Sequence, residues 1–274
     1  MKIILELSKS KIHTILLGII KNHFPENETD EELKKRNLGG KPEYLYEIIK
    51  HSKSLSKPLK DLPVLDIGCS WGAMLLTMKE IGFEELYGVD SDQFDTSRLQ
   101  NISTYKSYWG NEKGKLRFSI CDVSSQDLPF ESDFFSIVLI NQVIEHLHNP
   151  SKILKEIFRV LKKDGLVLVG TPNVAMLKNR LYLLTGKSNY YPLKEFLDFR
   201  IDSKFVGHVR EYTLDELSYM VNREGFNVIE KHVFPSEFKR NVPKSKLIYK
   251  LYNFIEKIFS NTGYYLLIIG QKRG

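Results

Sequence analysis

Residues 63–72 read PVLDIGCSWG, and this passage from an apolar run into a glycine-bearing turn decides the fold. A short unbroken apolar run is typical of a buried parallel strand, and residues 64–67 form one that includes Asp66. Gly68 and Gly72 lack a Cβ, so the backbone can approach a bound molecule closely there. A helix is predicted over 73–81, and its first amides suit an electron-rich group of a nucleotide-like ligand. Taken alone, the stretch fits a ligand-binding turn and a plain structural turn equally well.

The composition is that of an ordinary soluble protein with a full core. Of the 274 residues, 42% are hydrophobic and 27% are charged, and the net charge of +6 permits an acidic partner without requiring one. No apolar run approaches the roughly 20 residues that span a bilayer. Residues 1–20 are interrupted by charges and lack a small-residue cleavage site, so we expect a cytoplasmic protein.

Strands and helices alternate along most of the chain. Strands are predicted at 64–67, 85–90, 116–121, 134–140, 166–170, 225–234 and 264–270. Helices are predicted at 3–20, 42–50, 73–81, 92–106, 150–162, 213–223 and 245–259. This alternation indicates an α/β protein with an open, mostly parallel sheet covered by helices on both faces. Cys69 and Cys121 should then lie about 9–10 Å apart across an intervening strand, too far to form a disulfide.

Two regions depart from this alternation. Residues 174–210 hold scattered aromatic residues, and a connection this long is usually functional or a helical cap. These aromatics could line a site for an aromatic or prenylated substrate, or belong to ordinary core. The helix at 245–259 has an apolar face and a lysine-rich face, so it could lie on an anionic membrane as a peripheral contact or pack on the sheet.

The second predicted strand ends in an acid, Asp90. An open α/β sheet holds the two hydroxyls of a ribose with an acid at this strand end, about 20 residues beyond the glycine turn. Asp90 is therefore our first choice for a ligand-binding residue.

Five segments in order, 64–72, 88–90, 121–123, 141–146 and 161–165, resemble the motifs of class I S-adenosylmethionine-dependent methyltransferases. The resemblance covers about residues 60–235 and the last strand. Residues 143–147 and 208–213 are most similar to the branch with quinone-biosynthesis O-methyltransferases and with enzymes that modify glycans or lipids. The resemblance implies a Rossmann-like seven-stranded sheet with an antiparallel final strand. It also implies methyl transfer from S-adenosyl-L-methionine to a hydroxyl of a small-molecule, glycan or lipid acceptor.

The domain limits follow from this coverage. We expect a helical extension over 1–60 and a methyltransferase domain over 61–274, in which 174–210 covers the substrate.

The resemblance also implies roles for residues of the glycine turn. Asp66 would orient the methionine part of the cofactor through water or its amine. The backbone at Gly68, Cys69 and Gly72 would pass under the cofactor. Ser70 stands where the family commonly has a glycine, and a small hydroxyl residue is tolerable there if its dihedral angles are allowed.

The following strand ends are implied to hold the rest of the cofactor. Asp90 would bind the ribose hydroxyls, with Ser91 beside it. Asp122 would accept from the adenine amino group, while the Val123 backbone would meet the ring edge. Asn141 would lie near the methionine amine and the transferable methyl.

Catalysis of this kind asks for little beyond positioning. A sulfonium already makes its methyl group electrophilic, so a hydroxyl acceptor needs only in-line placement and a base. His208 and His146 are the candidate bases, because a neutral imidazole titrates near the working pH. His146 could instead pack under the cofactor, and Glu145 could orient either histidine or pair with a surface cation. Gln142 stands where the quinone branch often has an acid that helps to bind a metal, so we expect no metal.

Two other functions remain open. A NAD-dependent oxidoreductase would share the glycine turn and the acid after the second strand, but Gly68 and Gly72 do not have its G-x-G-x-x-G spacing. A non-catalytic cofactor-binding or RNA-associated protein of the same fold would explain the basic charge. The sequence shows no appended RNA-binding module, so we do not expect a nucleic-acid partner.

Overall fold

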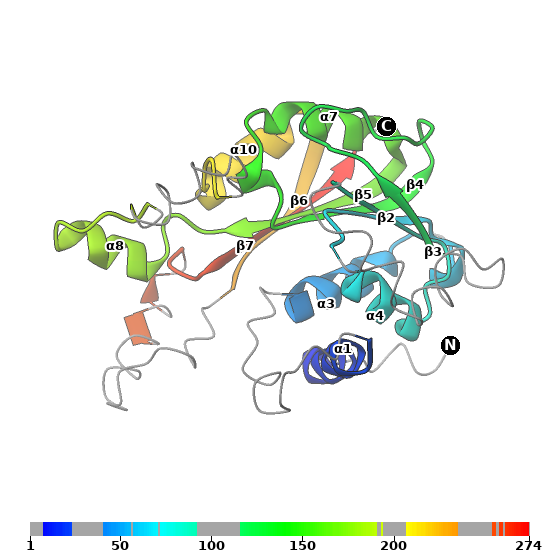
Figure 1. The fold of residues 1–274 in the computed structure, drawn as a ribbon, viewed down its shortest axis with the longest axis horizontal. Coiled ribbons are helices and arrows are strands. Elements are labelled where there is room, and N and C mark those ends of the chain that lie inside the picture. Colours follow the sequence, from blue (N-terminus) through cyan, green and yellow to red (C-terminus); the bar gives the residue numbers. More distant parts are fainter. Residues whose placement is uncertain are drawn as a thin grey trace.

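The structure is a computed structural model, and it describes residues 8–23, 41–55, 57–70, 72–91, 116–190, 193, 207–234, 254–255, 258–259 and 261–273. The described residues form three layers, with a central sheet between two groups of helices (Figure 1). One face carries α1 (Lys9–His23), α3 (Lys41–Ser52) and α4 (Ala73–Ile81). The other carries α7 (Pro150–Val160) and α10 (Leu214–Arg223).

Within the described residues, seven strands form one sheet in the order β3-β2-β1-β4-β5-β7-β6. The strands are β1 (Val64–Ile67), β2 (Leu86–Asp90), β3 (Leu116–Ile120), β4 (Phe135–Asn141), β5 (Leu161–Pro172), β6 (Phe226–Phe234) and β7 (Tyr265–Lys272). The first five pair in parallel, and β7 runs antiparallel to both β5 and β6. The predicted fold class is therefore confirmed. The ends of β1, β2, β4 and β5 that come last in sequence form one edge, which we call the carboxyl edge.

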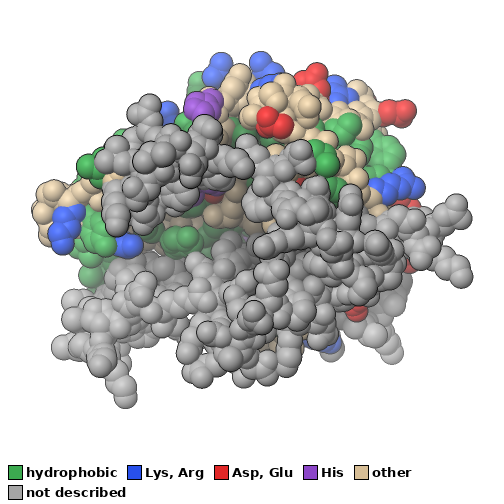
Figure 2. Space-filling model, in the orientation of Figure 1, with side chains coloured by type: hydrophobic (Ala, Val, Ile, Leu, Met, Phe, Trp, Pro, Cys, Tyr) green, Lys and Arg blue, Asp and Glu red, His purple; other side chains and the backbone are tan. Residues whose placement is uncertain are grey.

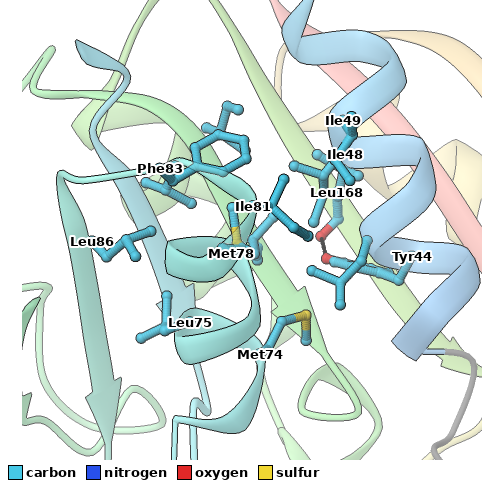
Figure 3. Packing of buried hydrophobic residues seen from close by; sticks show 14 of the residues in the cluster. Tyr44, Ile48, Ile49, Met74, Leu75, Met78, Ile81, Phe83, Leu86 and Leu168 are labelled. Atoms are coloured by element: carbon cyan, nitrogen blue, oxygen red, sulfur yellow. Dashed lines mark hydrogen bonds between the residues drawn. The ribbon is translucent and has the colours of Figure 1, made fainter. Parts of the chain in front are cut away.

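The central strands are apolar because both of their faces are covered. Every residue of β1, β2 and β4 is buried. On one face, Tyr44 of α3 reaches the backbone of β5, where its hydroxyl donates to the Leu168 carbonyl beside Met74 and Met78 of α4 (Figure 3). The same hydroxyl accepts from the Ile140 amide at 3.2 Å, so α3 is tied to the sheet next to the end of β4.

Several predicted boundaries need correction. The helix predicted at 150–162 ends at Val160, because Leu161 is fully buried and pairs with Phe135 as the first residue of β5. The predicted helix at 92–106 lies outside the described residues, as does most of the helix at 245–259. Part of the predicted cover contains a helix, α8 (Leu177–Leu184), which lies beyond the end of β5 (Figure 1).

The described surface and helices also bear on partners. Where Figure 2 shows described residues, Lys and Arg side chains are interspersed with Asp and Glu, so the positive charge is not gathered into one patch there. None of the described helices has the length and apolar character needed to cross a membrane. Cys69 and Cys121 are both free thiols.

Candidate functional site

The glycine turn after β1 is built from left-handed backbone. Gly68, Ser70 and Gly72 have φ angles of +71°, +49° and +71°. A Cβ on Gly68 would lie 2.2 Å from Cγ2 of Val143, so this position excludes a side chain. Ser70 occupies the small left-handed region at some conformational cost, which is the departure from the family pattern that the sequence showed. The turn is held in place by two amides, those of Gly68 and Cys69, which donate to the Val89 carbonyl at 2.9 and 3.1 Å.

Asp90 fastens this turn to the end of β2. Its carboxylate accepts from the Ser70 amide at 2.6 Å and from the Ser91 amide at 2.8 Å, one bond to each oxygen. A carboxylate oxygen has a second lone pair, so both oxygens can still accept from a diol. Burial raises the pKa of Asp90, and the two backbone hydrogen bonds oppose that effect. The residue that binds ribose in our prediction thus also shapes the glycine turn.

The side chains of Asp66 and Cys69 point away from solvent. Asp66 is 2% exposed and Cys69 is 6% exposed. Gly88 makes room for the thiol, because a Cβ there would lie 2.7 Å from Cys69 Sγ. Burial raises the pKa of Cys69 well above its usual value, which disfavours the reactive thiolate.

Asp122 closes a turn of its own after β3. The carboxylate accepts from the amide and hydroxyl of Ser124 at 3.0 and 2.7 Å, and from the Ser125 hydroxyl at 2.8 Å. The Ser124 hydroxyl is the main cause of its lowered pKa. Val123, in the same turn, is half-buried. An incoming adenine amino group would have to share this carboxylate with two serines.

Asn141, the last residue of β4, is held by a tyrosine that the sequence did not indicate. The Tyr265 hydroxyl donates to Asn141 Oδ1 at 2.5 Å, which leaves the amide NH2 group for other partners. A Cβ on Gly170 would lie 1.7 Å from the same hydroxyl, so Gly170 makes room for it. Residue 265 is far from 141 in sequence, which is why no local pattern predicted the contact.

The two candidate histidines meet just after β4. The amides of Val209 and Arg210 donate to the Glu145 carbonyl at 2.8 and 3.2 Å. His146 Nδ1 lies 3.2 Å from the Gly207 carbonyl oxygen, to which it donates. The rings of His146 and His208 lie edge to face with centroids 5.0 Å apart.

Glu211 is a further residue of this cluster that the sequence did not reveal. Its Oε1 lies 2.7 Å from His208 Nδ1, and this hydrogen bond is the main cause of the raised pKa of His208. Arg210, next to it, is paired with Glu216 at 2.6 Å. A spacing of three in an irregular segment does not predict which side chains will meet, so only the structure could find the pair.

Glu145 lies beneath the histidines and is fully buried. Its Oε2 accepts from the Thr171 hydroxyl at 2.9 Å, and burial raises its pKa to about 7. The alternative that Glu145 pairs with a surface cation is therefore wrong. Among the described residues, Glu145 Oε1 and Gln142 Nε2 are buried polar atoms without a hydrogen-bond partner. Ligand atoms of Glu145, His146 and His208 lie within 4.8 Å of one another, so the absence of a metal here stays a prediction.

The arrangement can hold a nucleotide-like ligand on one side and a proton acceptor on the other. The glycine turn follows β1, and Asp90 and Asn141 are the last residues of β2 and β4. The histidine cluster follows β4 at the same carboxyl edge. Open α/β sheets bind ligands at this edge.

Comparisons with known proteins identify the family of the chain. Residues 35–231 match the family model described as methyltransferase domain. The ubiquinone biosynthesis O-methyltransferase of Pelagibacter ubique is 29% identical over 134 residues, which are 49% of this chain and 51% of that protein. The uncharacterized methyltransferase YcgJ of Bacillus subtilis is 27% identical over 178 residues, 64% of this chain and 62% of that one. The chain thus matches about half of the length of several such relatives.

Solved structures support the fold. The YcgJ structure covers 85% of this chain and 99% of its own with a TM-score of 0.53 and 22% identity. Phosphoethanolamine N-methyltransferase 2 of Haemonchus contortus, in complex with S-adenosyl-L-methionine, covers 97% of this chain and 58% of its own with a TM-score of 0.55 and 16% identity.

Proposed function

Because the chain belongs to the methyltransferase domain family and is an S-adenosylmethionine-dependent methyltransferase, we propose that it methylates a hydroxyl of a small-molecule, glycan or lipid acceptor. The observation that carries this proposal is the pairing of His208 with Glu211 beside His146, at the carboxyl edge of the sheet. A hydroxyl that is not ionised must lose its proton as it is methylated, so it needs a base. A phenol acidic enough to be ionised already needs none.

The cofactor would be held by the residues that the sequence predicted. Asp90 would accept from the ribose hydroxyls with the lone pairs that Ser70 and Ser91 leave. Asn141 Oδ1 would accept from the methionine amine with the lone pair that Tyr265 leaves. The left-handed turn at Gly68–Gly72 presents backbone without side chains at its two glycines, as close approach of a ligand requires. S-adenosylmethionine supplies a methyl group on a sulfonium, which is electrophilic without help from the protein.

His208 would act as the general base. In this arrangement Nδ1–H donates to Glu211, which leaves the Nε2 lone pair to take the hydroxyl proton. Glu211 would stabilise the imidazolium that results, because a carboxylate beside a histidine favours its charged form. His146, whose Nδ1–H is bonded to Gly207, would position His208 through the edge-to-face contact.

The acceptor would have an apolar part. Among the described residues of the predicted cover, six large apolar ones are more than 40% exposed: Leu181, Leu183, Leu184, Tyr190, Leu193 and Val209. An apolar acceptor that buried these side chains would gain about 25 cal/mol for each Å² removed from water. The name of the Pelagibacter relative, which acts in ubiquinone biosynthesis, supports an acceptor of this kind. Peripheral contact with a membrane through 245–259 would fit the exposure of Phe254, Ile258 and Phe259.

Single substitutions in the pair of His208 and Glu211 test this function. His208→Ala should lower turnover roughly 10²–10⁴-fold with little change in S-adenosylmethionine binding, measured on hydroxyl acceptors drawn from quinone precursors, sugars and lipids. His148→Ala is the matched control, because that histidine is exposed beside the same turn.

The pH profile separates a base from a packing residue. The base works only when deprotonated, so activity rises with pH through the pKa of His208. Glu211→Gln removes the main cause of the raised pKa and should move this limb to lower pH. A loss of only a few-fold in His208→Ala, with an unchanged profile, would assign the histidine to packing.

A further inference from the structure

A second cluster of potential metal ligands lies between α3 and the edge strand β6. Glu47 and His51 are four residues apart on α3, so they share one side of the helix. Glu230 and His232 are two residues apart on β6, so they point to the same face of the sheet. Neither pair belongs to the methyl-transfer site described above.

Ligand atoms of Glu47, His51 and Glu230 lie within 4.8 Å of one another, and His232 Nε2 lies near the same two carboxylates. Oε2 of Glu230 lies 3.3 Å from His51 Nε2 and 2.8 Å from His232 Nε2. Oε2 of Glu47 lies 3.8 Å from each of the same two nitrogens. Zinc bonds to nitrogen and oxygen of about 2.0–2.1 Å place tetrahedral ligands about 3.3–3.4 Å apart. The observed separations bracket this value.

Among the described side chains, one buried nitrogen of this cluster lacks a hydrogen-bond partner, although both carboxylates accept from Lys50. The side chains of Glu47 and His51 are only 5% and 13% exposed. His51 Nε2 is fully buried and makes no hydrogen bond within the described residues, although it lies beside two carboxylates. The His232 ring is stacked on Phe234 with an interplanar angle of 8°, so its orientation is restricted.

A lysine now balances part of the negative charge. Lys50 Nζ lies 3.0 Å from Glu230 and 3.2 Å from Glu47, and its side chain is 45% exposed. A side chain this exposed can move into water at little cost when a cation replaces it. Two carboxylates and two neutral imidazoles with one divalent ion would be neutral without the lysine.

We propose that Glu47, His51 and Glu230, with His232 as the fourth donor, form a structural zinc site that fastens α3 to β6. A closed set of imidazole and carboxylate ligands suits Zn²⁺, whereas Mg²⁺ and Ca²⁺ prefer oxygen ligands alone. The site would hold the helix that carries Tyr44 against the outermost strand of the sheet.

Zinc binding to the full chain tests this proposal. The measurements are made in a double variant, His146→Ala/His208→Ala, which serves as the background protein. These substitutions remove two potential ligands of the other cluster, so zinc bound there does not confuse the result. After treatment with a chelator, this protein should bind one equivalent of Zn²⁺ by titration calorimetry and gain thermal stability from it. Adding His51→Ala and His232→Ala should weaken binding by more than the roughly 10- to 100-fold that even an outer-shell partner is worth. Circular dichroism and S-adenosylmethionine binding check that each variant folds.

A second substitution distinguishes a metal site from a network of ion pairs. Lys50→Met should tighten zinc binding if the ammonium competes with the ion, and it can be tested even if the histidine variants fail to fold. Equal zinc affinity with and without His51 and His232, no bound zinc in the background protein, or weaker binding in Lys50→Met would each overturn the proposal.

Discussion

Replacing Asp90 tests both functions that the structure gives to its carboxylate. Asp90→Ala removes the acceptor for the Ser70 and Ser91 amides and the expected acceptor for the ribose hydroxyls. Hydrogen bonds to a charged group are worth about 1.5–3 kcal/mol, so the dissociation constant for S-adenosylmethionine should rise roughly 10- to 150-fold. Titration calorimetry on the purified protein measures this directly.

Loss of the turn must be separated from loss of the ribose contact. Asp90→Ala leaves the half-buried Ser70 amide without its acceptor, which should lower the free energy of unfolding by about 1–3 kcal/mol in urea denaturation without ligand. Asp133→Ala is the control, because Asp133 precedes β4, at the opposite edge of the sheet from the site. A folded Asp90→Ala protein that binds within two-fold of the original would refute the ribose assignment.

Three further perturbations follow from the site. Burial raises the pKa of Glu145 from 4.5 to about 7, so the folded protein should lose at most about 3 kcal/mol of stability as pH rises between these values. Urea denaturation should show that Glu145→Gln lacks this loss, and the same pH dependence in both proteins would contradict the assignment. Gly170→Ala should displace Tyr265 from Asn141, lower the melting temperature and weaken S-adenosylmethionine binding, and an unchanged binding isotherm would deny Tyr265 its orienting role. Deleting most of residues 174–210 should abolish methyl transfer but spare cofactor binding; if calorimetry showed both lost, the segment would be structural.

The elements that were predicted correctly are those with a local signal. The strands β1, β2 and β4 are buried on both faces, so each reads as a short, mostly apolar run. The helix predicted from 213 begins there with a capping box between Thr213 and Glu216, whose two hydrogen bonds span only three residues. Gly68 and Gly72 were expected where the backbone comes close to a ligand, and the structure adds that both have a positive φ, which favours glycine.

The parts that could not be predicted depend on contacts between distant segments. Tyr265 reaches Asn141 only because β7 inserts beside β5, which no local periodicity indicates. Glu145 looks like a surface acid in sequence, yet the segment that starts at Gly207 folds over it and buries it.

The place of β7 has a consequence for the order of assembly during synthesis. β7 is the last strand in sequence, yet it lies between β5 and β6, so β6 has no neighbour in the sheet until β7 emerges from the ribosome. Until then both β5 and β6 expose unpaired edges, which are prone to wrong pairing and aggregation. Tyr265 arrives with the same strand, so the amide of Asn141 is oriented only at this final step. A nascent chain should therefore become competent to bind its cofactor late and abruptly, rather than gradually as the earlier strands form.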